Sequence, residues 1–260
     1  MTRTHEIGPG GKFGVALSLT AIGGFVDAVG YIVLFQVFTA NMSGNSVHIG
    51  IFLGQHDWPD LLRPFCAVAA YVLGMLLTRV AIEIAGRAGP KRIASATLAA
   101  EAVLLLLLAR ATPALYLGHM VDLHSPAYFT LVALLAFAMG VQTATLTHIG
   151  ALTIYTTFVT GTLTKFAESL TRALFWTYDE VLQHGMSHIV RVWRQQKDVR
   201  ETAMLLAIWS CYVLGAAAGA VMEHGWELRA LYLPVVVLIG FIVVDQLRPI
   251  DVEEEKHQTG

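Results

Sequence analysis

Long apolar runs alternate with short polar segments along almost the whole chain. Each run is close to the roughly 20 residues that an α-helix needs to cross about 30 Å of hydrocarbon. The pattern therefore predicts an all-α, polytopic membrane protein that forms a single membrane domain over residues 1–260. The six predicted spans are Phe13–Leu34, Pro64–Ala85, Ile93–Ala109, Ala127–Gly150, Thr202–Met222 and Ala230–Val244.

Two further segments, Gln36–Gly54 and Ala151–Ala173, carry small polar residues and glycines between apolar flanks. A bilayer offers no water to polar groups, so such a segment persists at membrane depth only where it is buried in protein or lines a cavity. We therefore expect two broken or re-entrant helices, and they are the leading candidates for a site. If they were full crossings, the chain would have eight spans instead of six.

The distribution of basic residues favours six spans. Arg87, Lys91 and Arg92 lie in one loop, and further arginines and lysines lie between residues 172 and 200. Few arginines or lysines occur in the loops that we assign to the outer side, around Gln55–Asp60, Leu115–Ser125 and Glu223–Arg229. With six spans and both termini cytoplasmic, every basic loop falls on the inner side, as the positive-inside rule requires.

The polar-centred stretch occurs twice. A gap-free shift of 117 residues pairs Gly23 with Gly140, Thr39 with Thr156, Ser43 with Thr160, and Gly44 with Gly161. This match predicts a first repeat over residues 13–110 and a second over 127–247. Each copy would hold three spans and one broken segment, so the copies would have opposite orientations. Inverted repeats with discontinuous helices are typical of secondary transporters, whose site lies between the copies.

One stretch, Trp176–Thr202, has no counterpart in the first repeat. Its apolar residues recur at helical spacing, with basic residues and histidines between them. This pattern predicts an amphipathic helix on the inner membrane surface, where basic side chains meet anionic lipid. We expect residues 176–202 to be a cytoplasmic insertion in the second repeat. Alternatively, this helix docks onto a partner or acts as a gate.

The residues GGFVDAVGYIVLFQVFTANMSGNSVHIG, followed in the second half by TTFVTGTLTKF, resemble the YoaK-like family of bacterial membrane proteins, a domain of unknown function. The resemblance covers nearly the whole chain. It implies the fold, a place in the bacterial inner membrane and the importance of these two blocks, but it supplies no substrate. Ser43 stands where the family is expected to have threonine, and the 176–202 insertion is less typical of it.

Asp27 lies deep in the first span. A carboxylate there costs about 2.5 to 3.5 kcal/mol on insertion scales, and such groups usually serve ion or proton pathways. The alternative is a structural hydrogen bond to the neighbouring broken helix. The shift pairs Asp27 with Ala144, so the acid is not duplicated and any proton coupling would be asymmetric.

Hydroxyl, amide and glycine residues at the centres of the two broken segments suit the starts of short helices. Such ends carry free backbone N–H groups and a positive dipole, which favour an anion or a carbonyl group. Alternatively, the glycines permit close helix crossing. The candidate substrate-binding residues, including polar positions of the fourth span, are Asp27, Thr39, Asn41, Ser43, Gly44, Asn45, Gln142, Thr143, Thr156, Thr160, Gly161 and Thr162.

These patterns favour a small-molecule transporter in which Asp27 is a candidate proton site. We do not expect the protein to be an enzyme. A second hypothesis is an intramembrane hydrolase similar to the rhomboid proteases, with Ser43 as nucleophile and His148 as base. Asn41 replaces the glycine expected two residues before that serine, so no catalytic residue is assigned. A third hypothesis is a channel or a non-transporting membrane scaffold.

The amino-acid composition further limits the class of protein and its expected partners. Only 14% of residues are charged and 55% are hydrophobic, which is typical of membrane proteins. The chain has no basic aromatic patch, so nucleic acid is not an expected partner. His184 and His188 share a helical face without a third ligand, so we expect neither a metal nor another cofactor. The expected partners are membrane lipid and a small-molecule substrate, and a homodimer is compatible with six short spans.

Further charged residues and two cysteines lie within the predicted spans. Glu101 in the third span is expected near the cytoplasmic end of its helix. The two cysteines, Cys66 and Cys211, lie in apolar spans and are expected to be buried, unpaired thiols.

Overall fold

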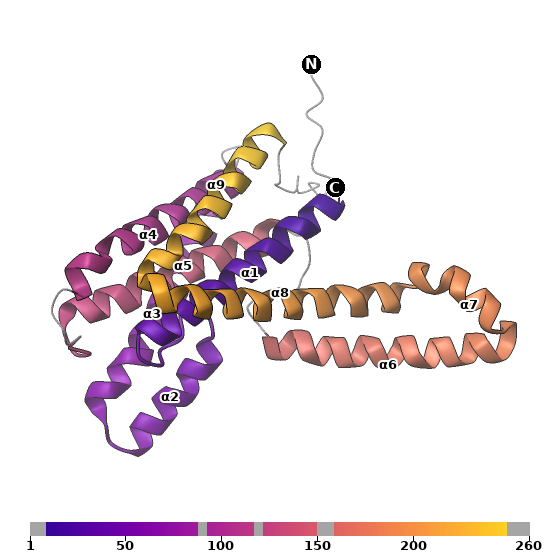
Figure 1. The fold of residues 1–260 in the computed structure, drawn as a ribbon, viewed down its shortest axis with the longest axis horizontal. Helices are drawn as coiled ribbons and strands as arrows, with labels where there is room; N and C mark the ends of the chain where they lie inside the picture. Colours follow the sequence, from indigo (N-terminus) through magenta and orange to yellow (C-terminus); the bar gives the residue numbers. More distant parts are fainter. Residues whose placement is uncertain (1–8, 88–92, 117–121, 150–158, 249–260) are drawn as a thin grey trace.

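A computed structural model describes residues 9–87, 93–116, 122–149 and 159–248, which form helices and short connecting turns without a strand (Figure 1). The all-α prediction is therefore confirmed. Six helices correspond to the predicted spans, with ends that differ by at most seven residues: α1 (Pro9–Val33), α3 (Trp58–Arg87), α4 (Ile93–Tyr116), α5 (Pro126–Ile149), α8 (Lys197–Trp226) and α9 (Tyr232–Leu247).

Within the described residues, five stretches are long and apolar enough to cross a membrane. Four of them are α1, α3, α4 and α5, and the fifth, Lys197–Leu247, contains α8 and α9 together with the 3₁₀ helix η2 (Glu227–Leu231) that joins them. Many apolar side chains of these helices face outward, as they would toward lipid; Leu76, Val103 and Leu214 are each more than half exposed. The protein is therefore a polytopic membrane protein.

Two helix pairs are packed especially closely, α1 with α8 and α3 with α5. A Cβ atom added to Gly24 or Gly215 would overlap a backbone carbonyl oxygen of the opposite helix, and the same holds for Gly74 and Gly140 in the second pair. Small residues let helix backbones approach within membranes, where van der Waals packing drives association. These glycines therefore fix the position of α8 against α1 and of α3 against α5.

The first polar-centred segment forms a short helix, α2 (Met42–Gly54), which packs against α3. Its 13 residues are about 20 Å long at 1.5 Å per residue, less than the hydrocarbon thickness of about 30 Å. The sequence therefore correctly predicted a helix that begins in the middle of this segment.

The second segment differs from its prediction. Helix α6 (Val159–His184) continues eleven residues beyond the expected end at Ala173 and is amphipathic along its length. It lies alongside α8, and the two form an arm that projects from the bundle (Figure 1). Residues 150–158 are outside the described part of the chain.

The single amphipathic helix predicted for residues 176–202 is not formed. This stretch contains the end of α6, helix α7 (Met186–Val192), the 3₁₀ helix η1 (Trp193–Gln195) and the start of α8. Gly185 ends α6 because its φ of +79° is incompatible with a continued helix. Gln196 then caps α8 by accepting a hydrogen bond from the N–H of Val199. The chain thereby reverses, and α8 returns along α6.

Polar contacts join the two sides of the arm. The Ser169 hydroxyl donates to the Asp198 carbonyl oxygen at 2.9 Å, and Arg172 Nε lies 2.8 Å from Asp198 Oδ1. These contacts hold α6 beside the first turn of α8.

At one end of the bundle, polar contacts connect two loops that the sequence predicted on the same side of the membrane. His124 Nε2 lies 3.2 Å from Asp60 Oδ1, and Arg63 pairs with the same carboxylate. The Arg63 guanidinium also donates to the Phe35 carbonyl oxygen at 2.9 Å. The α2–α3 and α4–α5 connections therefore lie at the same end, beside the end of α1.

Candidate functional site

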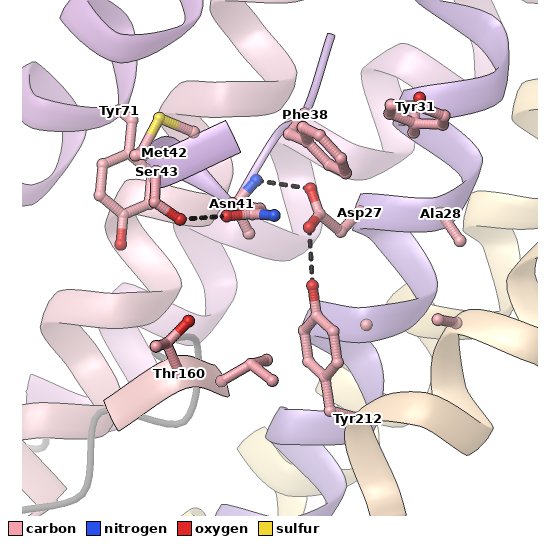
Figure 2. Close-up of a pocket in the computed structure, with 14 residues that line it drawn as sticks. Asp27, Ala28, Tyr31, Phe38, Asn41, Met42, Ser43, Tyr71, Thr160 and Tyr212 are labelled. Carbon is pink, nitrogen blue, oxygen red and sulfur yellow. Dashed lines mark hydrogen bonds between the residues drawn. The ribbon is translucent and has the colours of Figure 1, made fainter. Parts of the chain in front are cut away.

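A cavity of about 680 Å³ lies where the two halves of the chain meet (Figure 2). Its walls come from α1, the α1–α2 loop, α2, α3, α6 and α8. The first residues of α2, Met42 and Ser43, and the first residues of α6, Val159 and Thr160, line it together. Two helix N-termini that are far apart in the sequence therefore open onto one space.

The start of α2 is fixed by Asn41. Its side-chain oxygen accepts hydrogen bonds from the Gly44 N–H at 3.3 Å and from the Ser43 hydroxyl at 2.7 Å. This is the usual role of an asparagine at a helix N-cap. The N–H groups of Met42 and Asn45 donate to the Ala40 and Asn41 carbonyl oxygens, so Ser43 carries the one N–H of this first turn that has no partner among the described residues. Both Asn41 and Ser43 line the cavity.

Asp27 forms the junction of the site. Its Oδ1 accepts hydrogen bonds from the backbone N–H groups of Thr39 and Ala40, both at 2.8 Å, and from the Thr39 hydroxyl at 3.2 Å. Its Oδ2 accepts the hydroxyl of Tyr212 on α8 at 2.7 Å (Figure 2). The Asp27 residue is only 3% exposed, and each carboxyl oxygen has a donor. Asp27 therefore ties the loop before α2 to both α1 and α8.

Asn45 and Gly44 shape the loop beneath the cavity. The Asn45 side chain accepts from the Phe38 N–H at 2.9 Å and donates to the Phe38 carbonyl oxygen at 2.7 Å. A Cβ atom on Gly44 would come within 2.8 Å of the Phe38 ring. These two residues place the Phe38 ring, which lines the cavity, instead of lining it themselves.

The structure brings together only some of the predicted site residues. Asp27, Asn41, Ser43 and Thr160 line the cavity, while Thr39 is fully buried behind Asp27. Four others lie away from the lining: Thr162 is buried, Gly161 is exposed, and Gln142 and Thr143 are buried against other helices. Thr156 lies outside the described residues.

Aromatic residues of the site were not predicted. Tyr31, Tyr71 and Tyr212 line the cavity together with Phe38. Their only sequence signal is a tyrosine within an apolar span, where a buried hydroxyl needs a hydrogen-bond partner. The Tyr71 hydroxyl donates to Thr143 Oγ1 at 2.9 Å, and that of Tyr212 donates to Asp27.

A bundle of apolar helices around a cavity lined by polar and aromatic side chains defines the class as a polytopic membrane protein. Residues 15–244 match the family model described as "Protein of unknown function (DUF1275)", so the chain belongs to this family. It is 26% identical over 233 residues to the UPF0700 transmembrane protein YoaK of Bacillus subtilis (strain 168), an alignment that covers 89% of this chain and 92% of the relative. The resemblance to a YoaK-like family is thus confirmed. No solved structure matches the chain.

Proposed function

We propose that the protein is a carrier that binds a small polar solute in the cavity between the N-termini of α2 and α6. The observation on which this rests is that Ser43 and Thr160, residues of two different helix starts, line the same cavity. A volume of about 680 Å³ is in the usual range for small-molecule sites.

The chemistry of the lining narrows the solute class. The N–H of Ser43 and the positive end of the α2 helix dipole favour a carbonyl or carboxylate oxygen. Among the described residues that line the cavity, none is Lys, Arg or His, so a multiply charged anion would lack a cation to balance it. Tyrosine rings supply apolar faces with a polar edge. We infer a small, uncharged or zwitterionic solute with an exposed carbonyl or carboxylate group.

Reciprocal helix pairing supports an inverted repeat. The helix that follows the first polar segment, α3, packs on α5, the first helix of the second half. The next predicted span after the second polar segment, α8, packs on α1, the first helix of the first half. Such an exchange places the cavity between two similar units, and rocking of one unit against the other is the usual basis of alternating access.

The contacts of Asp27 support a bridging role between these units. Asp27 belongs to α1 and Tyr212 to α8, and their hydrogen bond lies at the cavity wall. A proton-coupling role for Asp27 stays a prediction. Asp27→Asn tests it: the variant should lose pH-driven accumulation but keep exchange if Asp27 carries the coupled proton.

Ser43 is better explained as a helix-capping residue than as a nucleophile. Its hydroxyl donates to Asn41, whose amide oxygen cannot act as a general base. The hydrolase alternative therefore gains no support from this geometry, and we propose that the protein is not an enzyme.

We further propose six spans in the bacterial inner membrane with both termini cytoplasmic. The His124–Asp60 contact supports it, because the loops that it joins are the ones assigned to the outer side. The test uses two single-cysteine variants, His56→Cys and Lys91→Cys, each on a Cys66→Ala/Cys211→Ala background. Their thiols should differ in accessibility from outside intact cells. An impermeant maleimide should label the first and not the second; the opposite result would make α2 a full crossing.

The carrier proposal is tested first by binding. Purified protein is heated with a panel of amino acids, amides, polyols and carboxylates, because a ligand at 100 times its Kd stabilises by about 2.7 kcal/mol. Thr160→Trp should abolish the stabilisation, whereas Thr171→Trp, an exposed position farther along α6, should keep it. Hits then go into proteoliposome uptake assays. Binding without uptake would support a non-transporting scaffold, and hits insensitive to Thr160→Trp would contradict the site.

A further inference from the structure

A second buried polar pair lies outside the cavity. Glu101 of α4 and Gln142 of α5 both have no exposed surface, and Gln142 Nε2 donates to Glu101 Oε1 at 2.9 Å. The sequence predicts Glu101 near the end of its helix. It follows the first residue of α4 by eight positions, about 12 Å along the helix axis, and is sealed by packing.

One acceptor oxygen on each partner lacks a hydrogen bond. Glu101 Oε2 and Gln142 Oε1 are both buried and without a donor in the described part of the chain. A buried acceptor without a donor is unfavourable, and an ionised carboxylate in that position is far more so. The pair therefore has two acceptor oxygens without a donor, and one additional hydrogen atom between them would satisfy both.

No charged neighbour compensates a negative Glu101 among the described residues. Helices α5 and α9 and the 3₁₀ helix η2 pack against α4, and α3 touches it. Residues 126–147 of α5 include no ionisable group except Tyr128, whose hydroxyl donates to Leu34. The ionisable groups of the other elements are Asp60, Arg63, Cys66, Tyr71, Arg79, Glu83, Arg87, Glu227, Arg229, Tyr232 and Asp245, and α4 itself carries Arg110. None of these forms an ion pair or hydrogen bond with Glu101 in the part of the chain that the structure describes.

We propose that Glu101 is a proton-binding site of this protein. A neutral carboxyl group gains one O–H donor at Oε2, and Gln142 Oε1 is the buried acceptor on the same partner side chain. The acid and the amide would then exchange two hydrogen bonds, and no charge would remain in the helix bundle. Asp27 contrasts with this pair, because donors already reach both of its oxygens.

The proton site is connected to the cavity through α5. Thr143, which follows Gln142, accepts the hydroxyl of Tyr71, and Tyr71 lines the cavity. Movement of this turn of α5 would therefore change both contacts together. On the proposed carrier function, Glu101 then couples proton binding to the cavity, separately from the predicted role of Asp27; the proton site itself does not depend on that function.

Infrared spectroscopy of the purified protein in lipid tests the site without any substrate. At pH 7 the wild type should show the C=O band of a protonated carboxylic acid, shifted in D₂O and lost in Glu101→Gln. Asp27→Asn should keep the band. Gln142→Leu leaves the acid in place but removes its partner, so the band should move to higher frequency.

The proposal is overturned if the wild type lacks this band, or if Glu101→Gln leaves it unchanged. It is also overturned if sodium chloride, and not potassium chloride, raises the melting temperature of the wild type but not of Glu101→Gln, since a sodium ion would then occupy the gap. If the infrared result is as expected and no solute is taken up, the proton site stands and the carrier function fails.

Discussion

Asp27 and Tyr212 are 185 residues apart in the chain, yet the Tyr212 hydroxyl donates to the Asp27 carboxylate at 2.7 Å. The contact joins α1 to α8 beside the glycines that let these helices approach. It also closes a chain of hydrogen bonds from α8 through Asp27 to the loop that starts α2. One buried acid thus links the two halves of the protein at the cavity.

Removal of the Tyr212 hydroxyl should weaken this link. Hydrogen bonds to charged groups contribute about 1.5–3 kcal/mol, so Tyr212→Phe should lower the free energy of unfolding by that amount. Thermal unfolding in detergent, followed by tryptophan fluorescence, measures it. Tyr178→Phe, at an exposed position of α6, is the control and should leave the melting temperature unchanged. Equal melting temperatures for Tyr212→Phe and the wild type would contradict the role of the contact.

Substitutions of Asp27 should separate its contacts from its charge. Asp27→Asn keeps an acceptor for the N–H groups of Thr39 and Ala40, whereas Asp27→Ala leaves both without their partner. Each buried donor left unpaired costs about 1–3 kcal/mol, so the alanine variant should be less stable than the asparagine variant by about 2 kcal/mol or more. Unfolding in detergent measures the difference. Equal stability of the two variants would show that the hydrogen bonds from Asp27 do not stabilise the loop before α2.

The glycines of the helix pairs should tolerate no side chain. Gly215→Ala places a methyl group on a backbone carbonyl oxygen of α1, and overpacking of this kind costs about 1–3 kcal/mol. Gly240→Ala is the matched control, because no atom lies within 4 Å of its Cβ position. Fluorescence-detected size exclusion should show less folded protein for Gly215→Ala only. A folded yield as low for Gly240→Ala would assign the effect to helix propensity or lipid contact.

Ser43 should accept a threonine. The hydroxyl of the introduced threonine can still donate to Asn41, so Ser43→Thr should change the free energy of unfolding by less than about 0.5 kcal/mol and keep solute binding. Ser43→Val, which introduces a side chain of similar size without the hydroxyl, should weaken both. Labelling of wild-type Ser43 by a fluorophosphonate that is lost in Ser43→Thr would instead indicate a serine nucleophile.

The sequence predicts the helices of this fold well, because membrane spans and helix caps are local features. The predicted spans match the helices to within seven residues at each end, and the cluster around Asn41 marks the start of α2. The predicted end of α6 lies too early, since amphipathic periodicity continues through Trp176 without a break until Gly185. The predicted boundary at Ala173 divides this periodic stretch between two elements.

Contacts between helices that are far apart in the chain could not be predicted from the sequence. Nothing in the residues around Tyr212 indicates that α8 crosses α1 at Asp27, because that depends on packing between the two halves. The burial of Glu101 could not be predicted for the same reason. Its place in the sequence suggests a position near the membrane surface, whereas packing of α5 and α9 over α4 buries it completely.

The shared cavity of the two helix starts is tested most directly by cross-linking Ser43→Cys to Thr160→Cys. The variant is made on a Cys66→Ala/Cys211→Ala background with a protease site inserted between residues 88 and 92. A short bifunctional thiol reagent should keep the two fragments together after cleavage. Ser43→Cys with Thr171→Cys is the control, since position 171 lies about 16 Å farther along α6. The predicted result is cross-linking of the Ser43→Cys/Thr160→Cys pair alone. The shared site would be contradicted by equal cross-linking of both pairs. It would also be contradicted if the first pair did not cross-link although each of its two thiols reacted with a monofunctional reagent.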